Sequence, residues 1–197
     1  MITILDYGMG NLRSVEKAIQ AVGGQCEIRD SIGSCEKLII PGVGAFGAAM
    51  ERLEPLKQEI QAFAASGAPL LGICLGQQLL FESSQEMGEF TGLEIIGGTV
   101  KYFERKPGLK IPHIGWSALS YQRDGALAEG GCNGEQVYFV HSLHTQCADP
   151  ADVLATAEYG DQTFAAAVCR GNVWGAQFHP EKSSSIGLRM LRKFVEC

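Results

Sequence analysis

Short apolar runs and amphipathic stretches alternate along the first half of the chain. The apolar runs predict strands at 2–5, 26–29, 37–40 and 70–73, and we expect the third to stop at Pro41 and Gly42. Apolar residues at helical spacing predict helices at 12–22, at 45–65 and from Cys74 to about Glu82. Strands that alternate with helices in this way are typical of a parallel sheet with helices on both faces.

The second half of the chain is rich in strands. Its apolar runs predict strands at 93–96, 116–119, 137–140, 153–159, 164–168 and 173–178, several of which we expect to pair antiparallel at one edge or in a small side sheet. A last helix is expected after Ser183, Ser184 and Ser185, which are good N-cap residues. The pattern therefore predicts a three-layer α/β fold with a mostly parallel central sheet, helices on both faces and extra antiparallel strands from the second half.

Length and composition narrow the function. The 197 residues suit one domain that spans 1–197, and the net charge of −6, without a lysine- or arginine-rich run, argues against nucleic acid as a partner. No apolar stretch is long enough for a membrane span, and the N-terminus lacks the features of a signal peptide. The seven scattered cysteines form no C-x-x-C pair and no zinc spacing, so we expect reduced thiols in a cytoplasmic protein without metal or cofactor.

Cys74 carries the clearest chemical signal. It ends the apolar run at 70–73, Gly72 and Gly76 flank it, and a helical pattern follows it directly. This predicts a strand-to-helix corner like the nucleophile elbow of hydrolases, with sulfur in place of a hydroxyl. A helix N-terminus lowers the pKa of a thiol, and the backbone N–H of Leu75 would point at a developing oxyanion. The alternative is a small buried cysteine without a catalytic role.

A candidate base lies near the other end of the chain. His179 and Glu181 flank a proline, which favours an extended conformation and so places both side chains on one side. Glu181 would then fix the tautomer of His179, as the third member of a catalytic triad does. The alternative is a surface His-Pro-Glu turn. Of the other histidines, we expect His141 to line the cleft, and His113 and His144 to be structural or exposed.

A second glycine-rich feature precedes the helix at 45–65. Gly42, Gly44 and Gly47 form a G-x-G-x-x-G string, which is the form of a dinucleotide-binding fingerprint. However, the string is not in the first βα unit, and the next strand ends at Cys74 rather than at an acidic residue. We therefore favour exposed backbone N–H groups near the nucleophile over a dinucleotide site.

Three motifs stand in one order along the chain. They are Pro41-Gly42-Val43-Gly44, Gly72-Ile-Cys74-Leu-Gly76-Gln-Gln78 and Phe178-His179-Pro180-Glu181. Together they resemble the class I, triad-type glutamine amidotransferases, which implies the α/β fold expected above. Stretches along the whole chain resemble, more narrowly, the glutaminase subunits of imidazole glycerol phosphate synthase; these stretches are 6–12, 41–48, 114–116, 138–142 and 177–183.

This resemblance implies a reaction and a partner. Cys74 would attack the side-chain amide of glutamine and form a γ-glutamyl thioester, while His179, held by Glu181, would protonate the departing ammonia and then activate water. A separate (β/α)₈-barrel cyclase subunit would form a heterodimer with the chain. It would use the ammonia to make imidazole glycerol phosphate and an aminoimidazole carboxamide ribonucleotide in histidine biosynthesis.

The resemblance also implies roles for the residues around the site. It implies that Leu75, Val43 and Gly44 stabilise the oxyanion, and that Gln78, Gly42 and Ser142 help to hold glutamine. The residues that would face the cyclase are Asn11, Trp116, Tyr138 and Lys182. Because two glycines flank Val43, we hypothesise that this peptide reorients when the partner carries its ligand.

The chain departs from the family pattern at two positions. Gln77 stands where many relatives carry methionine, and Leu143 stands where an aromatic residue is common. Three alternative functions stay open at this point: a paralogous subunit that feeds ammonia to another acceptor, as in sugar amination; a thiol hydrolase that acts without a partner on a peptide or γ-glutamyl substrate; and a scaffold without activity. Copurification with a barrel partner, or glutamine turnover that rises when the cyclase is added, would separate them.

Overall fold

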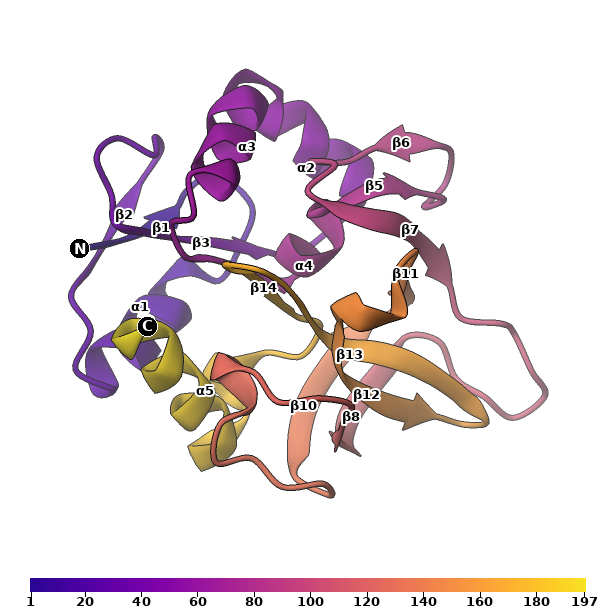
Figure 1. Cartoon of the computed structure of the whole chain (residues 1–197). Coiled ribbons are helices and arrows are strands. Elements are labelled where there is room, and N and C mark those ends of the chain that lie inside the picture. Colours follow the sequence, from indigo (N-terminus) through magenta and orange to yellow (C-terminus); the bar gives the residue numbers. More distant parts are fainter.

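An eight-stranded sheet runs through the centre of the computed structural model, which describes residues 1–197 apart from the side chain of Ala126 (Figure 1). The strand order is β2-β1-β3-β4-β14-β13-β12-β9, with parallel pairing from β2 to β14 and antiparallel pairing beyond. These strands are β1 (Ile2–Leu5), β2 (Cys26–Arg29), β3 (Lys37–Gly42), β4 (Leu70–Cys74), β9 (Ser120–Tyr121), β12 (Val153–Tyr159), β13 (Gln162–Arg170) and β14 (Val173–Ala176). The predicted sheet is confirmed.

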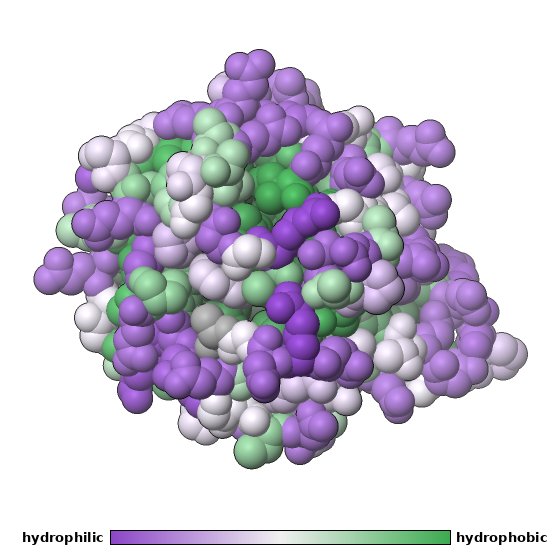
Figure 2. All heavy atoms as spheres, in the orientation of Figure 1, coloured by the Kyte–Doolittle hydropathy of each residue, from purple (hydrophilic) through white to green (hydrophobic). Residues whose placement is uncertain are grey.

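Helices cover both faces of this sheet. Neighbouring residues along a strand point to opposite faces, so each strand supplies side chains to both helix layers. Ile39 packs in one hydrophobic cluster with residues of α1 (Leu12–Ala21) and α5 (Ser184–Glu196). Leu38 and Ile40 pack in a second cluster with α2 (Phe46–Leu53) and α3 (Lys57–Ala65). Hydrophilic residues cover most of the face shown in Figure 2. Within the described residues, no helix combines the length and the apolar character that crossing a bilayer requires.

The second half of the chain adds two smaller sheets. In the first, β8 (His113–Ala118) pairs antiparallel with β10 (Gln136–His141). The second has the order β11-β7-β5-β6, with the bounds β5 (Phe81–Ser84), β6 (Phe90–Thr91), β7 (Ile96–Tyr102) and β11 (Leu143–Cys147). The short helices are α4 (Leu75–Leu79), η1 (Glu54–Leu56), η2 (Ala126–Ala128), η3 (Pro150–Asp152) and η4 (Pro180–Lys182). The predicted antiparallel additions are therefore present.

Two predicted helices are wrong in their extent. The helix expected at 45–65 is interrupted by η1, because Pro55 has no N–H to donate in an α-helix. The helix expected to reach about Glu82 ends at Leu79, and Phe81 begins a strand. Leu79, Leu80 and Phe81 are all fully buried, so no one-sided helical stripe continues past α4.

Two predicted strands also differ from the structure. The strand expected at 93–96 is wrong, because Glu94 has a φ of 55° and β7 begins at Ile96. The strand expected to stop before Pro41 continues to Gly42. Pairing with β1 ends at Ile39, so the missing N–H of Pro41 costs no hydrogen bond on that side. Pairing with β4 continues, and it places Gly42 directly opposite Cys74.

Candidate active site

Cys74 lies at the predicted strand-to-helix corner, as the last residue of β4 and the N-cap of α4. Its φ of 55° and ψ of −108° are rare for a residue other than glycine, and such a conformation costs about 1–3 kcal/mol. Both flanking glycines are needed for the corner. A Cβ on Gly76 would lie 1.8 Å from the carbonyl oxygen of Ile40, and a Cβ on Gly72 would lie 2.5 Å from that of Gly76.

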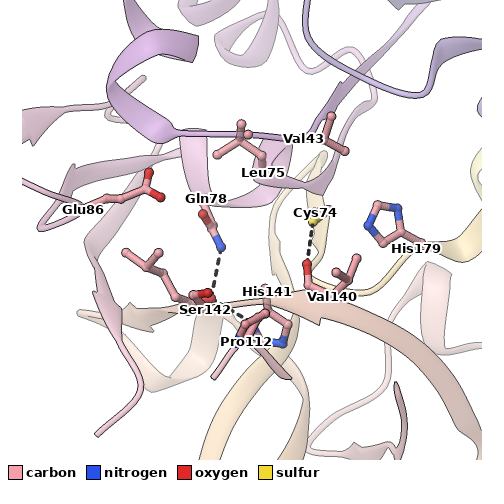
Figure 3. A pocket seen from close by; sticks show the side chains of 12 residues that line it. Val43, Cys74, Leu75, Gln78, Glu86, Pro112, Val140, His141, Ser142 and His179 are labelled. Atoms are coloured by element: carbon pink, nitrogen blue, oxygen red, sulfur yellow. Dashed lines mark hydrogen bonds between the residues drawn. The ribbon is translucent and has the colours of Figure 1, made fainter. Parts of the chain in front are cut away.

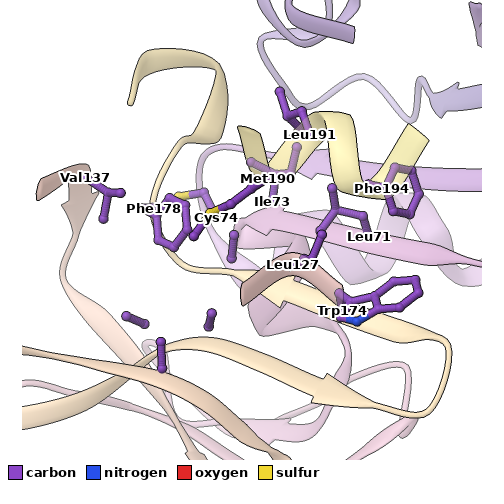
Figure 4. Close-up of a cluster of buried hydrophobic side chains, with 14 of the residues drawn as sticks. Leu71, Ile73, Cys74, Leu127, Val137, Trp174, Phe178, Met190, Leu191 and Phe194 are labelled. Atoms are coloured by element: carbon purple, nitrogen blue, oxygen red, sulfur yellow. The ribbon is translucent and has the colours of Figure 1, made fainter. Parts of the chain in front are cut away.

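Buried packing fixes this corner from behind. Cys74 belongs to the hydrophobic cluster shown in Figure 4, where Ile73, Phe178 and Met190 lie around it. Only 6% of Cys74 is exposed. The sulfur lies 3.9 Å from the carbonyl oxygen of Val140. A rigid support of this kind is what holds a strained backbone in place.

His179 and Glu181 form the predicted pair. His179 Nδ1 donates to Glu181 Oε1 over 2.8 Å, and their side chains are 3% and 1% exposed. The backbone at His179 is extended, as expected before a proline, and its N–H donates to the carbonyl of Tyr138. Ser183 occupies the predicted N-cap of α5 but makes no capping bond. Its hydroxyl instead donates to the carbonyl oxygen of His179 and accepts from the N–H of Tyr138.

The imidazole of His179 lies beside Cys74 on the wall of one pocket (Figure 3). Its Nε2 is buried and has no hydrogen-bond partner among the described groups. Burial would lower the pKa of His179, but interactions with Cys74 and then with Glu181 outweigh it and raise this pKa to about 9. The ring is therefore protonated at neutral pH, which is the state that a cysteine nucleophile uses.

The pocket has a volume of about 310 Å³ and opens at the corner. It brings together residues of β4, α4, β10, β11 and the loops around them. The lining residues besides Cys74 and His179 are Val43, Gly44, Leu75, Gln78, Glu86, Pro112, Val140, His141, Ser142 and Leu143. All residues predicted for catalysis, oxyanion stabilisation or glutamine binding, except Gly42 and Glu181, therefore reach the pocket wall. Glu181 lies behind His179.

Backbone groups of two segments border the pocket where an oxyanion would form. Leu75 is the first residue of α4, and N–H groups in the first turn of a helix have no intrahelical partner. Val43 is 44% exposed, and Gly44 has a φ of +107°, which a side chain would disfavour. Tyr7 holds the base of this segment, since its hydroxyl donates to the carbonyl oxygen of Pro41 over 2.7 Å. Burial raises the pKa of Tyr7, which keeps the donor proton in place.

Gly42 is not among the residues that line the pocket, and its contact with glutamine stays a prediction. A Cβ there would lie 2.5 Å from the hydroxyl of Tyr7 and 2.9 Å from the Cβ of Leu75. Its position opposite Cys74 lets β3 approach α4 closely. The residue is therefore a spacer between the two oxyanion segments.

Gln78 and Ser142 lie on the pocket wall as expected. Gln78 Nε2 donates to the carbonyl oxygen of Leu143 over 3.1 Å (Figure 3). It also donates to Gln177 Oε1 over 3.0 Å. These two bonds use both amide hydrogens, so the amide oxygen of Gln78 is the atom left for a ligand.

The sequence patterns missed Glu86. This carboxylate lines the pocket and accepts from the backbone N–H of Phe46, at the start of α2. It reaches the pocket because β5 and β6 pair across a turn that the apolar pattern did not predict. An exposed-looking glutamate in a polar segment carries no local signal for such a position.

The remaining histidines are buried. His141 lines the pocket, as predicted. His113 is 3% exposed and His144 is 8% exposed, and both pack against aromatic rings. Of the two alternatives for His113 and His144, structural or exposed, the structural one is therefore the case. Among the described residues, no three His, Cys, Asp or Glu side chains are grouped so that they could hold a metal ion.

The two departures from the family pattern lie in different places. Leu143 lines the pocket, and its carbonyl accepts from Gln78. Gln77 is fully buried away from the pocket lining, and its Nε2 donates to Thr145 Oγ1 over 3.1 Å. Its side-chain oxygen has no partner among the described groups.

Three of the four residues expected to face a partner lie together on one surface. Trp116 of β8 and Tyr138 of β10 are opposite each other, with ring centroids 5.9 Å apart. Lys182 Nζ lies 6.0 Å from the centre of the Tyr138 ring. Trp116 is 51% exposed, and its neighbour Ile114 is 61% exposed. The fourth residue, Asn11, is exposed at the start of α1, which packs against η4.

Comparisons with known proteins give one consistent picture. The family model described as "Glutamine amidotransferase class-I" matches residues 3–197. The chain is 49% identical over 200 residues to the imidazole glycerol phosphate synthase subunit HisH of Rhodopirellula baltica, covering 99% of this chain and 97% of that protein. It is 48% identical to the protein of the same name in Methanosarcina barkeri, over 99% and 98% of the two chains.

Solved structures agree on the fold. A crystal structure described as a glutamine amidotransferase superposes with a TM-score of 0.76 at 20% identity, over 99% of this chain and 97% of the other. The structure of PurLQS from Thermotoga maritima superposes with a TM-score of 0.75 at 19% identity, over 99% and 96%. At such low identity these likenesses concern the arrangement of helices and strands alone.

Proposed function

Because the chain belongs to the class I glutamine amidotransferase family, we propose that the pocket around Cys74 hydrolyses the side-chain amide of glutamine. Relatives that match over nearly the whole of both chains narrow the function: the chain is the glutaminase subunit of imidazole glycerol phosphate synthase, an enzyme of histidine biosynthesis. The observation that carries the chemical proposal is the buried pair of His179 and Glu181 beside Cys74. One glutamine amidotransferase domain, 1–197, holds the site.

Cys74 and His179 share the chemistry of both half-reactions. The sulfur of Cys74 attacks the amide carbon, and His179 gives its Nε2 proton to the amide nitrogen as the C–N bond breaks. Ammonia leaves, and a γ-glutamyl thioester remains on the sulfur. His179 then takes a proton from water, whose oxygen attacks the thioester carbon; the C–S bond breaks and glutamate leaves. Glu181 supports the imidazolium form and its orientation throughout.

Backbone donors stabilise the negative oxygen of each tetrahedral intermediate. The N–H of Leu75 and the peptide between Val43 and Gly44 both border the pocket next to Cys74. Donors that are in place when charge develops lower the barrier, and removing one costs about 10²- to 10³-fold in kcat. The Val43–Gly44 peptide completes this set when it reorients on binding of the loaded partner. Gly42 contributes as the spacer that lets these two segments approach.

The amino-acid end of glutamine needs partners of both signs. We assign its ammonium group to the Glu86 carboxylate, because an acidic side chain at the pocket wall offers a charge-assisted acceptor. The side-chain oxygen of Gln78 is a second acceptor for the ammonium group, and Ser142 offers its hydroxyl as a donor to the carboxylate. Gln78 is well placed for this role, since both of its amide hydrogens are already bonded to protein groups.

The partner is the cyclase subunit that the names of the relatives imply. We propose that this subunit is a (β/α)₈ barrel, that it forms a heterodimer with the chain in the cytoplasm, and that it turns the ammonia into imidazole glycerol phosphate and an aminoimidazole carboxamide ribonucleotide. The exposed cluster of Trp116, Tyr138 and Lys182, with Asn11 nearby on α1, is the proposed contact surface. The seven cysteines are free thiols, which suits a reducing compartment.

Glutaminase assays with and without the cyclase subunit and its nucleotide ligand test this function. We expect glutamine turnover to rise when both are present, and Cys74→Ala to lose at least about 10⁴-fold of that turnover in the same complex. Turnover that is the same with and without the cyclase would contradict the assignment and fit a thiol hydrolase that acts alone.

A further inference from the structure

At the pocket wall and directly beneath it, two buried histidines and a serine form a row of hydrogen bonds. Ser117 Oγ lies 3.1 Å from His113 Nε2, and His113 Nδ1 lies 3.3 Å from His141 Nε2. His141 Nδ1 lies 2.7 Å from the carbonyl oxygen of Leu143. We propose that Ser117, His113 and His141 are positioning residues for glutamine, which hold the Leu143 carbonyl where it orients Gln78. This inference rests on the glutaminase function proposed above.

The direction of every bond in the row follows from its last acceptor. A carbonyl oxygen can only accept, so His141 carries its hydrogen on Nδ1, and its Nε2 accepts from His113. His113 therefore also carries its hydrogen on Nδ1, and its Nε2 accepts from the hydroxyl of Ser117. The three side chains thus form a row in which every donor points in the same direction, and the row ends at the Leu143 carbonyl.

The row of hydrogen bonds requires a neutral His141, because a second hydrogen, on its Nε2, would face the Nδ1 hydrogen of His113. A second hydrogen on His113, on its Nε2, would reverse the bond with Ser117, whose hydroxyl would then accept. The direction described above therefore needs both imidazoles neutral. The surroundings keep them neutral. Burial lowers the pKa of His113 to about 4 and that of His141 to about 3. His113 is stacked between Tyr159 and Phe139, with ring centroids 4.0 and 5.1 Å away. The titratable groups that face the pair from other elements are Tyr159 of β12, His144 of β11 and His179 before η4.

The last acceptor of the row, the Leu143 carbonyl, lies at the substrate pocket. The Leu143 carbonyl accepts from His141 and from Gln78, so one oxygen joins the row to the amide that we assign to glutamine binding. Gln78 continues through Gln177 Oε1, and Gln177 Nε2 lies 4.0 Å from the sulfur of Cys74. A carbonyl held from two sides leaves Gln78 with one orientation, and its oxygen free for the ligand.

A pair of His141 variants separates positioning from packing. His141→Asn keeps a donor near the Nδ1 position but loses the ring, whereas His141→Phe keeps a ring of similar size but has no donor. In glutaminase assays of the complex with the cyclase subunit, we expect His141→Phe to raise the KM for glutamine about 10-fold with kcat changed less than about 3-fold, and His141→Asn to stay closer to wild type. A packing role predicts the reverse order, and that result would overturn the proposal.

Two further measurements keep the proposal testable if a His141 variant does not fold. The pair His113→Asn and His113→Phe poses the same question one step earlier and should give the same order. In the folded wild-type protein, long-range ¹H–¹⁵N correlation spectra of the imidazoles should show both His113 and His141 with hydrogen on Nδ1; hydrogen on Nε2 of His141 would overturn the proposal. Cys74→Ala, assayed alongside, separates a failure of this proposal from a failure of the proposed function. If Cys74→Ala kept full turnover, the proposed function would be wrong, and the histidine tautomers would still show whether the row of hydrogen bonds has the proposed direction.

Discussion

At the scale of single residues, the structure stores strain where the chemistry is proposed to occur. Cys74 has a positive φ, and the residues around it leave no room for the backbone to relax. The glycine-flanked motif predicted this corner, because such a turn needs residues without side chains on both sides. No local motif marked Glu86, because its place depends on the pairing of β5 with β6.

The strain at Cys74 predicts an unusual order of stabilities. Cys74→Gly should be more stable than Cys74→Ala by about 1 kcal/mol, because glycine adopts a positive φ without steric cost and alanine does not. Both variants should lack glutaminase activity. Urea denaturation of the two proteins measures the difference. Equal stabilities, or a more stable alanine variant, would mean that the corner is not strained.

Glu86 provides a second prediction at this scale. Glu86→Gln should raise the KM for glutamine by about 10-fold or more, since a charge-assisted bond to the substrate ammonium becomes a neutral one. The kcat should change little, because Glu86 is remote from the reacting amide. Steady-state kinetics of the complex give both constants. A lower kcat at an unchanged KM would place Glu86 in a different role.

At the scale of elements, alternation along one strand separates two functions. In β8, His113 and Ser117 point inward to the hydrogen-bonded row, while Ile114 and Trp116 are largely exposed. The sequence pattern predicted part of this strand but not its pairing with β10, because two short strands give no signal for their partners. The break at Pro55 was readable from the proline itself, whereas the end of α4 depends on burial from all sides.

The exposed face of β8 predicts a partner contact. Trp116→Ala should weaken binding of the cyclase subunit by about 10-fold or more, because exposed aromatic residues contribute strongly to protein interfaces. The free energy of unfolding of the Trp116→Ala variant should stay within about 0.5 kcal/mol of the wild-type value, as for other surface changes. Titration calorimetry with the cyclase subunit tests this, and Tyr102→Ala, another exposed aromatic change, is the matched control. Unchanged affinity in Trp116→Ala would move the contact surface elsewhere.

At the scale of the whole molecule, buried histidines make stability depend on pH in both directions. The pKa values of His113 and His141 are lowered to about 4 and about 3, below the usual 6.5, so below pH 6.5 the unfolded chain binds more protons and stability falls with acidification. His179 has a raised pKa of about 9, so its contribution is present below pH 6.5 and is lost as pH rises through 9.

We therefore expect the free energy of unfolding to be greatest near neutral pH. It should fall on both sides by up to about 1.4 kcal/mol per pH unit for each group that titrates. Urea denaturation from pH 4.5 to 9 gives the curve, and His179→Gln should remove the alkaline loss alone. A flat curve from pH 6.5 down to 4.5 would show that the buried histidines titrate normally.

Much of the whole fold was predictable, because a parallel sheet with helices on both faces leaves a regular alternation of buried runs and amphipathic helices. The arrangement of β5, β6, β7 and β11 was not, since short strands at the sheet edge are specified by contacts between distant segments. The triad was predictable because short local motifs mark its residues. Glu86 and the histidine row at the pocket wall were not, because contacts between distant segments place them.

The most direct test of the central claim is the mass of the protein during turnover. The complex with the cyclase subunit, quenched rapidly in acid during reaction with glutamine, should contain protein heavier by glutamine less ammonia, with the added group on the peptide that holds Cys74. His179→Gln should slow both half-reactions, because His179 protonates the departing ammonia and also activates the water, so turnover should fall sharply. Glutamine turnover that persists in Cys74→Ala at the wild-type rate, with no added mass on the peptide that holds Cys74 in the wild-type protein, would contradict the account.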